Sequence, residues 1–172
     1  MESKEFKKRI LPLGQPLYRF AAGLLKDSHE AEDVVQDIFL KLWSMRDKME
    51  EIKNISAFAY TMTRNVCLDK LKSKRIKYYD NALPGIPEPS VNDPDPGSVV
   101  DMKDSADRVK VLISNLPEQQ KAIIHLRDID GYSYEEISEI MNMEINTIRV
   151  ALSRARRFVR ESLIKTHEPW NI

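Results

Sequence analysis

Five arginines and no acidic residue occupy residues 146–160 of this chain. At about 100° per residue, Arg149, Ser153 and Arg156 project into one narrow sector of a helix, and an apolar stripe lies opposite. A solvated helix face usually mixes both signs, so a one-sided cationic face favours contact with an anion such as DNA phosphate over plain solvation. The candidate contact residues are Asn146, Thr147, Arg149, Val150, Ser153, Arg154, Arg156 and Arg157.

A short helix and a tight turn precede this arginine face. Ser133 followed by Glu136 is a capping-box pattern and predicts a helix start there. Two short helices joined by a tight turn, the second of them basic, indicate a helix-turn-helix. Between Asp128 and Glu144 every ionised residue is acidic. The pattern itself gives no role for this acidic half.

Residues 64–77 form a second cationic segment, with six basic residues against the single Asp69. Cations near a helix C-terminus favour the helix dipole, but that effect accounts for two or three of them. A second nucleic-acid surface is therefore the favoured interpretation, with Asn65 and the nearby Tyr60 able to hydrogen-bond to bases or stack on them. The candidate residues are Arg64, Asn65, Asp69, Lys70, Lys72, Lys74 and Arg75.

Three helical patterns account for the first half of the chain. The first covers about residues 5–25 and is expected to be regular only from Pro16, because of its prolines and glycine. The second begins at Asp27 or Ser28, and the third covers about residues 56–77. The second presents a polar face, either solvated or offered to a basic partner, that comprises Asp33, Gln36, Asp37 and Lys41.

A proline-rich segment divides the chain of 172 residues, whose formal net charge is zero. Residues 81–97 contain five of the nine prolines and no lysine or arginine, which is typical of a linker. The sequence therefore predicts an all-α protein of two small helical domains joined by a flexible linker. The expected divisions are residues 1–80, a linker over 81–102, a second domain over 103–166 and a tail over 167–172.

The remaining composition argues against several other classes. Cys67 is the only cysteine, and the charged N-terminus lacks a signal-peptide core, so a reducing cytoplasmic location is expected. The three histidines lack ligand spacing, and no phosphate loop or Ser/His/Asp arrangement appears. We expect neither metal, cofactor, catalytic residue nor small-molecule substrate.

Four segments in order resemble bacterial sigma factors of the extracytoplasmic-function (ECF) group, within the sigma-70 family. Residues 29–43 resemble the segment that binds core RNA polymerase, and residues 58–71 resemble the segment after it. Residues 116–120 and 131–137 are similar to the start of the family's C-terminal domain, and residues 147–156 to its recognition helix. The resemblance implies sigma region 2, a bundle of three to four helices, followed by sigma region 4, a four-helix helix-turn-helix domain.

The resemblance also implies what each surface does. The face with Asp33, Gln36 and Asp37 would dock on the largest subunit of core polymerase, the second-largest subunit being a further contact. Asn65, Asp69 and residues 44–56 would bind the −10 promoter element, and the arginine face would read the −35 element in the major groove. An anti-sigma factor is a further expected partner, and the protein free of polymerase is expected to be monomeric.

Some features depart from the family or leave other functions open. Glu144 and Ile145 stand where the family commonly has a small polar N-cap, so the recognition helix is expected to start at Asn146 or to lack a strong cap. The paired tryptophans of housekeeping sigma factors are absent from the third helix. A two-domain helix-turn-helix regulator is the alternative function; an enzyme with a binding tail has little support.

Overall fold

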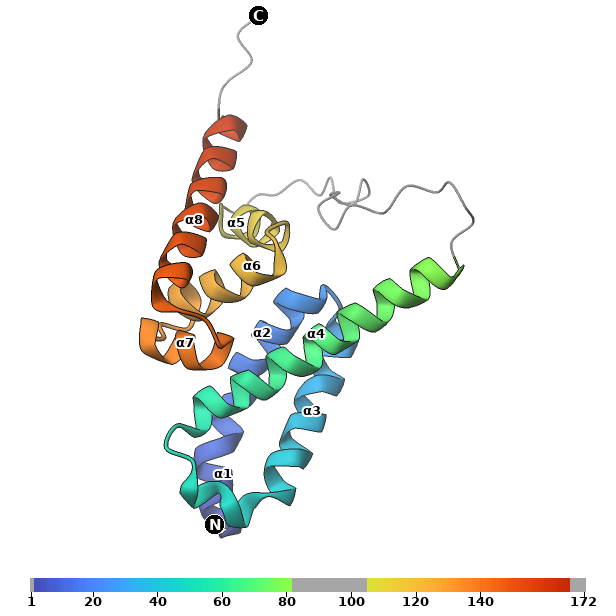
Figure 1. Cartoon of the computed structure of the whole chain (residues 1–172), viewed down its shortest axis with the longest axis vertical. Coiled ribbons are helices and arrows are strands. Elements are labelled where there is room, and N and C mark those ends of the chain that lie inside the picture. The colour runs from blue at the N-terminus through green and yellow to red at the C-terminus, as the bar shows by residue number, and fades with distance from the viewer. Residues whose placement is uncertain (1, 82–104, 168–172) are drawn as a thin grey trace, which may run out of the picture.

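The computed structural model describes residues 2–81 and 105–167, and every regular element within these ranges is helical (Figure 1). The predicted linker, apart from Asn81, and the tail beyond His167 lie outside the described residues. The first half contains α1 (Ser3–Ile10), α2 (Gly14–Leu25), α3 (Ser28–Ser44) and α4 (Ile55–Asn81), with the 3-10 turns η1 (Leu11–Leu13) and η2 (Arg46–Glu51). The second contains α5 (Ser105–Ser114), α6 (Glu118–Ile124), the π-helical turn η3 (His125–Ile129), α7 (Tyr134–Met141) and α8 (Ile145–His167).

The N-terminal helices begin earlier than the sequence pattern predicts. Helix α1 is regular from Ser3, and α2 starts at Gly14 and not near Pro16. Pro12 lies at the start of η1, and Pro16 lies in the first turn of α2, where a missing N–H breaks no intrahelical hydrogen bond. The prolines therefore shape the junction between two helices without shortening the second.

The start of α3 agrees with the prediction. The side chain of Asp27 accepts a hydrogen bond from the backbone N–H of Glu30 at 3.0 Å, so Asp27 is the N-cap. Asn54 caps α4 in the same way, because its Oδ1 accepts from the N–H of Ala57 at 2.9 Å. Helix α4 then extends to Asn81, four residues beyond the predicted range. These caps fix where the two longest helices of the first half begin.

The core of the first half forms where α2, α3 and α4 pack together. Buried aliphatic and aromatic side chains from all three helices meet there, including Phe20, Ile38, Leu42 and Tyr60. The ring of Phe6 from α1 packs edge-on against Trp43 at 4.9 Å between centroids. The predicted bundle of three to four helices is confirmed.

The second half is a four-helix domain with the predicted helix-turn-helix. Ser133 accepts from the N–H of Glu136 at 3.1 Å and Glu136 accepts from the N–H of Ser133 at 2.9 Å, so the predicted capping box is present. Helix α7 ends at Met141, and its C-cap residue Asn142 has a left-handed backbone with φ 51°. Helix α8 begins at Ile145, one residue before the predicted Asn146.

The two halves of the chain lie against each other. Helix α2 packs on α6 and α4 packs on α7, as Figure 1 shows. The contact joins residues far apart in sequence, for example Asn54 with Glu136 and Arg19 with Asp130. The sequence pattern gave no expectation for how the two domains are oriented.

Candidate nucleic-acid and polymerase interfaces

The arginine face of α8 is exposed as its periodicity predicts. The eight candidate residues from Asn146 to Arg157 are all exposed, whereas Ile148, Leu152 and Ala155 on the opposite stripe are buried. The guanidinium of Arg149 lies over the ring of Tyr134, with its Cζ 5.1 Å from the centroid. This contact from α7 orients Arg149 and leaves it on the exposed face.

Two arginines of this face are already ion-paired within the protein. Arg156 makes a two-pronged contact with the carboxylate of Asp128, with distances of 2.9 Å from Nε and 2.5 Å from an Nη. Arg157 donates from Nε to Glu161 at 2.7 Å. The hydrogen bonds that Arg156 donates to Asp128 and Arg157 donates to Glu161 raise the pKa of these two guanidinium groups. Arg156 and Arg157 are therefore less available to an external anion than Arg149.

Several acidic residues between Asp128 and Glu144, which precede α8, have structural roles. Asp128 pairs with Arg156, and Glu136 completes the capping box of α7 while also accepting a hydrogen bond from Asn54 at 3.2 Å. Asp130 is buried in the contact between the two domains. Glu135, Glu139 and Glu144 remain exposed. Asp128, Asp130 and Glu136 therefore stabilise the second domain or join it to the first.

The basic part of α4 is also exposed, with some of its charges engaged. Asn65, Asp69, Lys72, Lys74 and Arg75 are exposed, and Arg64 and Lys70 are half-buried. Lys74 forms an ion pair with Glu30 of α3 at 2.6 Å, and Arg75 reaches Glu118 of α6 at 3.4 Å. Burial lowers the pKa of Arg64.

The polar face of α3 is exposed at all four predicted positions, Asp33, Gln36, Asp37 and Lys41. The structure adds an apolar residue beside them that the sequence reasoning missed. Leu40 is 68% exposed, which is unusual for a leucine in a helix whose other aliphatic residues pack inward. Its departure from the apolar stripe of α3 is the signal that would have identified it. Helix α3 therefore offers a mixed acidic and apolar surface suited to a protein partner.

Tyr60, expected to be available to nucleic-acid bases, is instead fully buried between the two domains. Its hydroxyl donates to Oδ2 of Asp130 at 2.8 Å, and its ring packs against Phe20 and Tyr132. Burial, followed by the hydrogen bond to Asp130, raises the pKa of Tyr60. The prediction that Tyr60 can stack on bases is therefore wrong for this arrangement, because the second domain covers the ring.

Asp130 is the centre of the polar contact between the domains. Its carboxylate lies 3.5 Å from the guanidinium of Arg19 and 3.3 Å from Nε2 of His125, in addition to the Tyr60 hydroxyl. Burial alone would raise the pKa of Asp130, but the polar contacts with His125, Tyr60 and Arg19 outweigh it and leave that pKa below its usual value. Ser56 and Tyr132 share a further short hydrogen bond across the same contact.

Neither a metal-binding cluster nor a reactive thiol is found among the described residues. No cluster of histidine, cysteine and carboxylate side chains suited to a metal occurs in ranges 2–81 and 105–167. Cys67 is buried, and burial raises the pKa of its thiol to about 12, which keeps it protonated and unreactive near neutral pH. None of the helices in those ranges combines the length and apolar character that a membrane span requires.

A helix-turn-helix domain with an exposed arginine face, joined to a second helical domain with its own basic helix, defines a DNA-binding transcription factor. The sequence matches Sigma-70 region 2 over residues 10–76 and Sigma-70, region 4 over residues 106–159. The chain belongs to the sigma-70 family and is an ECF sigma factor. It is an alternative sigma factor, which directs promoter-specific initiation of transcription.

Relatives and solved structures agree with this assignment. The chain is 27% identical over 154 residues to the ECF RNA polymerase sigma factor SigW of Bacillus subtilis, covering 86% of this chain and 82% of SigW. It is 28% identical over 151 residues to SigE of Mycolicibacterium smegmatis, covering 87% of this chain and 58% of that longer protein.

Two solved structures share the arrangement of helices. The sigma factor RpoE of Bartonella quintana, solved with the anti-sigma factor NepR, superposes with a TM-score of 0.74 at 30% identity, covering 96% of this chain and 99% of that one. CnrH, solved with the cytosolic domain of CnrY, gives a TM-score of 0.67 at 17% identity, covering 97% and 92% of the two chains, and supports the fold alone.

Proposed function

We propose that the three exposed surfaces divide the work of promoter recognition. Asp33, Gln36, Asp37 and Lys41 of α3, with Leu40 beside them, bind core RNA polymerase. The basic face of α4 binds the −10 element through Arg64, Asn65, Asp69, Lys70, Lys72, Lys74 and Arg75. The face of α8 from Asn146 to Arg157 binds the −35 element. The protein acts in the cytoplasm, without catalysis of its own, and corresponds to region 2 over residues 1–80 and region 4 over residues 103–166.

The observation that carries this proposal is the segregation of α8 into an exposed arginine face and a buried apolar stripe. Helix α8 packs on α5, α6 and α7, so its outer face is the one left for a major groove. Arg149 is the strongest candidate for base contact because Tyr134 orients it, whereas Arg156 and Arg157 would first have to give up their ion pairs with Asp128 and Glu161.

Promoter binding by this division of labour requires the two domains to separate. Asn54 and Ser56 lie within residues 44–56, which the family resemblance also assigns to the −10 element, and both are hydrogen-bonded to the second domain. The strand could not reach these two side chains while Glu136 and Tyr132 hold them. Core polymerase, by binding each domain on its own surface, would favour the open arrangement. An anti-sigma factor that prefers the closed arrangement would act in the opposite direction.

Promoter-specific transcription in vitro with purified core polymerase tests the proposal. We expect the parent chain to initiate at a subset of a promoter library. Arg149→Ala should weaken −35 binding by about 1–3 kcal/mol and relax base preference at one position. Asp37→Ala should reduce the affinity for core polymerase without changing which promoters are chosen.

Arg157→Ala is the matched control for Arg149→Ala. Arg157 lies on the same helix but is paired with Glu161, so its loss should weaken binding evenly across sequences and lower the salt dependence. Tight binding of duplex DNA by the chain alone, with no promoter-specific initiation from core polymerase, would instead support the helix-turn-helix regulator.

A further inference from the structure

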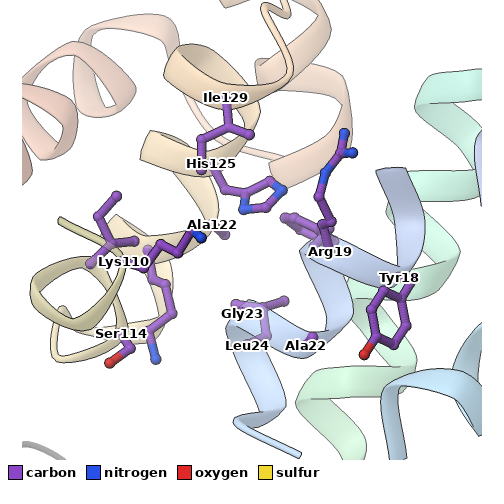
Figure 2. Close-up of a pocket in the computed structure, with 13 residues that line it drawn as sticks. Tyr18, Arg19, Ala22, Gly23, Leu24, Lys110, Ser114, Ala122, His125 and Ile129 are labelled. Carbon is purple, nitrogen blue, oxygen red and sulfur yellow. The ribbon is translucent and has the colours of Figure 1, made fainter. Parts of the chain in front are cut away.

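A cavity of about 360 Å³ lies between the two domains, with α2 on one side and α5 and α6 on the other (Figure 2). Its α2 wall is formed by residues from Tyr18 to Leu24, and its opposite wall includes Ile113, Ala122 and Ile129. The volume is that of a small-molecule site, and most of the lining is apolar. A body of hydrocarbon or aromatic character would fit these walls.

The charged groups on the lining all have one sign. Arg19, Lys110 and Lys121 line the cavity, and no acidic residue is among the described residues that do so. Arg19 is directed to Asp130 at 3.5 Å, and Lys110 is paired with Asp107 at 3.1 Å. Lys121 is 3% exposed, and among the described residues we find no hydrogen bond or ion pair for its ammonium group. An ammonium group that is largely removed from water and has no ion-pair partner is costly, so a ligand that supplies an anion would lower that cost.

The surroundings of Lys121 reinforce this charge imbalance. Burial lowers the pKa of Lys121 to about 8, with the neighbouring charge of Lys26 acting in the same direction. Glu118 is the acidic neighbour that opposes the shift, but it already pairs with Arg75 at 3.4 Å. At neutral pH the ammonium therefore remains largely charged and uncompensated.

Gly23 leaves space in the cavity where α2 faces His125, because glycine has no side chain. A Cβ at this position would lie 3.8 Å from Nδ1 of His125, in ordinary van der Waals contact, so the glycine is not required by backbone conformation or by a clash. A larger side chain at residue 23 would project into the cavity from within a helix, where replacing glycine also favours the helical state.

We propose that this cavity binds a small amphipathic anion, with its apolar body between α2 and α6 and its anionic group at Lys121. Because both domains line the cavity, the site is complete only in the closed arrangement. A ligand that binds only this arrangement stabilises it by mass action. If the proposed function is right, such a ligand lowers promoter-specific initiation by holding the domains together.

Titration calorimetry of the full chain with decanoate, below its micelle-forming concentration, tests the binding site. We expect one decanoate per chain, and binding weaker by about tenfold or more for 1-decanol, which lacks the charge, and for Lys121→Met, which removes the cation. Gly23→Leu, which projects a bulky side chain from the α2 wall into the cavity, should weaken binding. Lys4→Met makes the same change at an exposed position of α1 and should bind as the parent does.

Four outcomes would contradict the proposed binding site. They are no binding of decanoate, several decanoates bound per chain, equally tight binding of 1-decanol, or unchanged binding of decanoate by folded Gly23→Leu and Lys121→Met. Circular dichroism establishes that the variants are folded. Transcription assays test the regulatory role separately. Promoter-specific initiation by the parent should fall as decanoate is added, whereas initiation by Lys121→Met should not change. Binding without this loss would retain the site and overturn its regulatory role.

Discussion

Asp130 and Lys121 are two buried charges that the protein treats differently. Asp130 is surrounded by Tyr60, Arg19 and His125, so its ionised form is stabilised despite burial. Lys121 has no such set of partners among the described residues, and its pKa falls to about 8. A buried carboxylate with polar partners on the other domain favours the contact between the two surfaces, whereas an unpaired ammonium lowers stability. The two residues therefore make opposite contributions at neutral pH.

The pH dependence of stability should reveal the cost of Lys121. The pKa of Lys121 is about 8 in the folded chain and near 10.5 in the unfolded chain. Between pH 8 and 10.5 the unfolded chain therefore binds more protons at this residue. The free energy of unfolding consequently rises with pH through that window. Lys121→Met should be more stable than the parent at pH 7, and its advantage should shrink by about 2 kcal/mol by pH 10.

Urea unfolding of both proteins at a series of pH values measures this difference. Comparing the two cancels the titration of Cys67 and Tyr60, whose raised pKa values act on parent and variant alike. Lys4→Met should show no such trend, because Lys4 is exposed. An advantage of Lys121→Met that stays constant from pH 7 to 10 would contradict the prediction.

At the scale of single elements, side-chain hydrogen bonds cap the starts of α3, α4 and α7. Asp27 caps α3, Asn54 caps α4 and the reciprocal pair Ser133–Glu136 caps α7. The π-helical turn η3 follows α6 and closes with a bond from the N–H of Asp130 to the carbonyl of His125 at 3.0 Å. The turn places these two residues together at the surface that meets the first domain.

Ser133→Ala should destabilise the helix-turn-helix by about 1 kcal/mol, because it leaves the N–H of Glu136 without its side-chain acceptor. Chemical denaturation of the full chain measures the loss. Ser73→Ala, at an exposed position inside α4, is the matched control and should be neutral or slightly stabilising. A loss at Ser133 no larger than at Ser73 would mean that the capping box contributes little.

At the scale of the whole molecule, the closed pair of domains is the main feature that tertiary structure adds. The polar contacts of Asp130, Ser56 and Asn54 lie beside the edge-on packing of Tyr60 on Tyr132. Arg75 with Glu118 adds an exposed ion pair of small value. The arrangement covers part of the surface proposed for the −10 element while leaving the faces of α3 and α8 exposed.

Asp130→Ala should open the molecule. It leaves the Tyr60 hydroxyl and the Arg19 guanidinium without their acceptor, at a cost of about 1–3 kcal/mol in the closed arrangement alone. Small-angle X-ray scattering should then report a larger radius of gyration and a broader distance distribution than for the parent. Glu139→Ala, an exposed acid of the same segment, should leave both unchanged. Identical scattering from all three proteins would show that Asp130 does not hold the domains together.

Local patterns in the sequence determined the helices, the capping box, the two faces of α8 and the division into two domains, because each depends on residues within a few turns of one another. The family followed from the order of such segments. Tertiary structure alone decided that Asp128 pairs with Arg156, that Tyr60 is buried against Asp130, and that a cavity forms around Lys121. These depend on how far-separated helices pack, and no periodicity along the chain encodes which surfaces will meet.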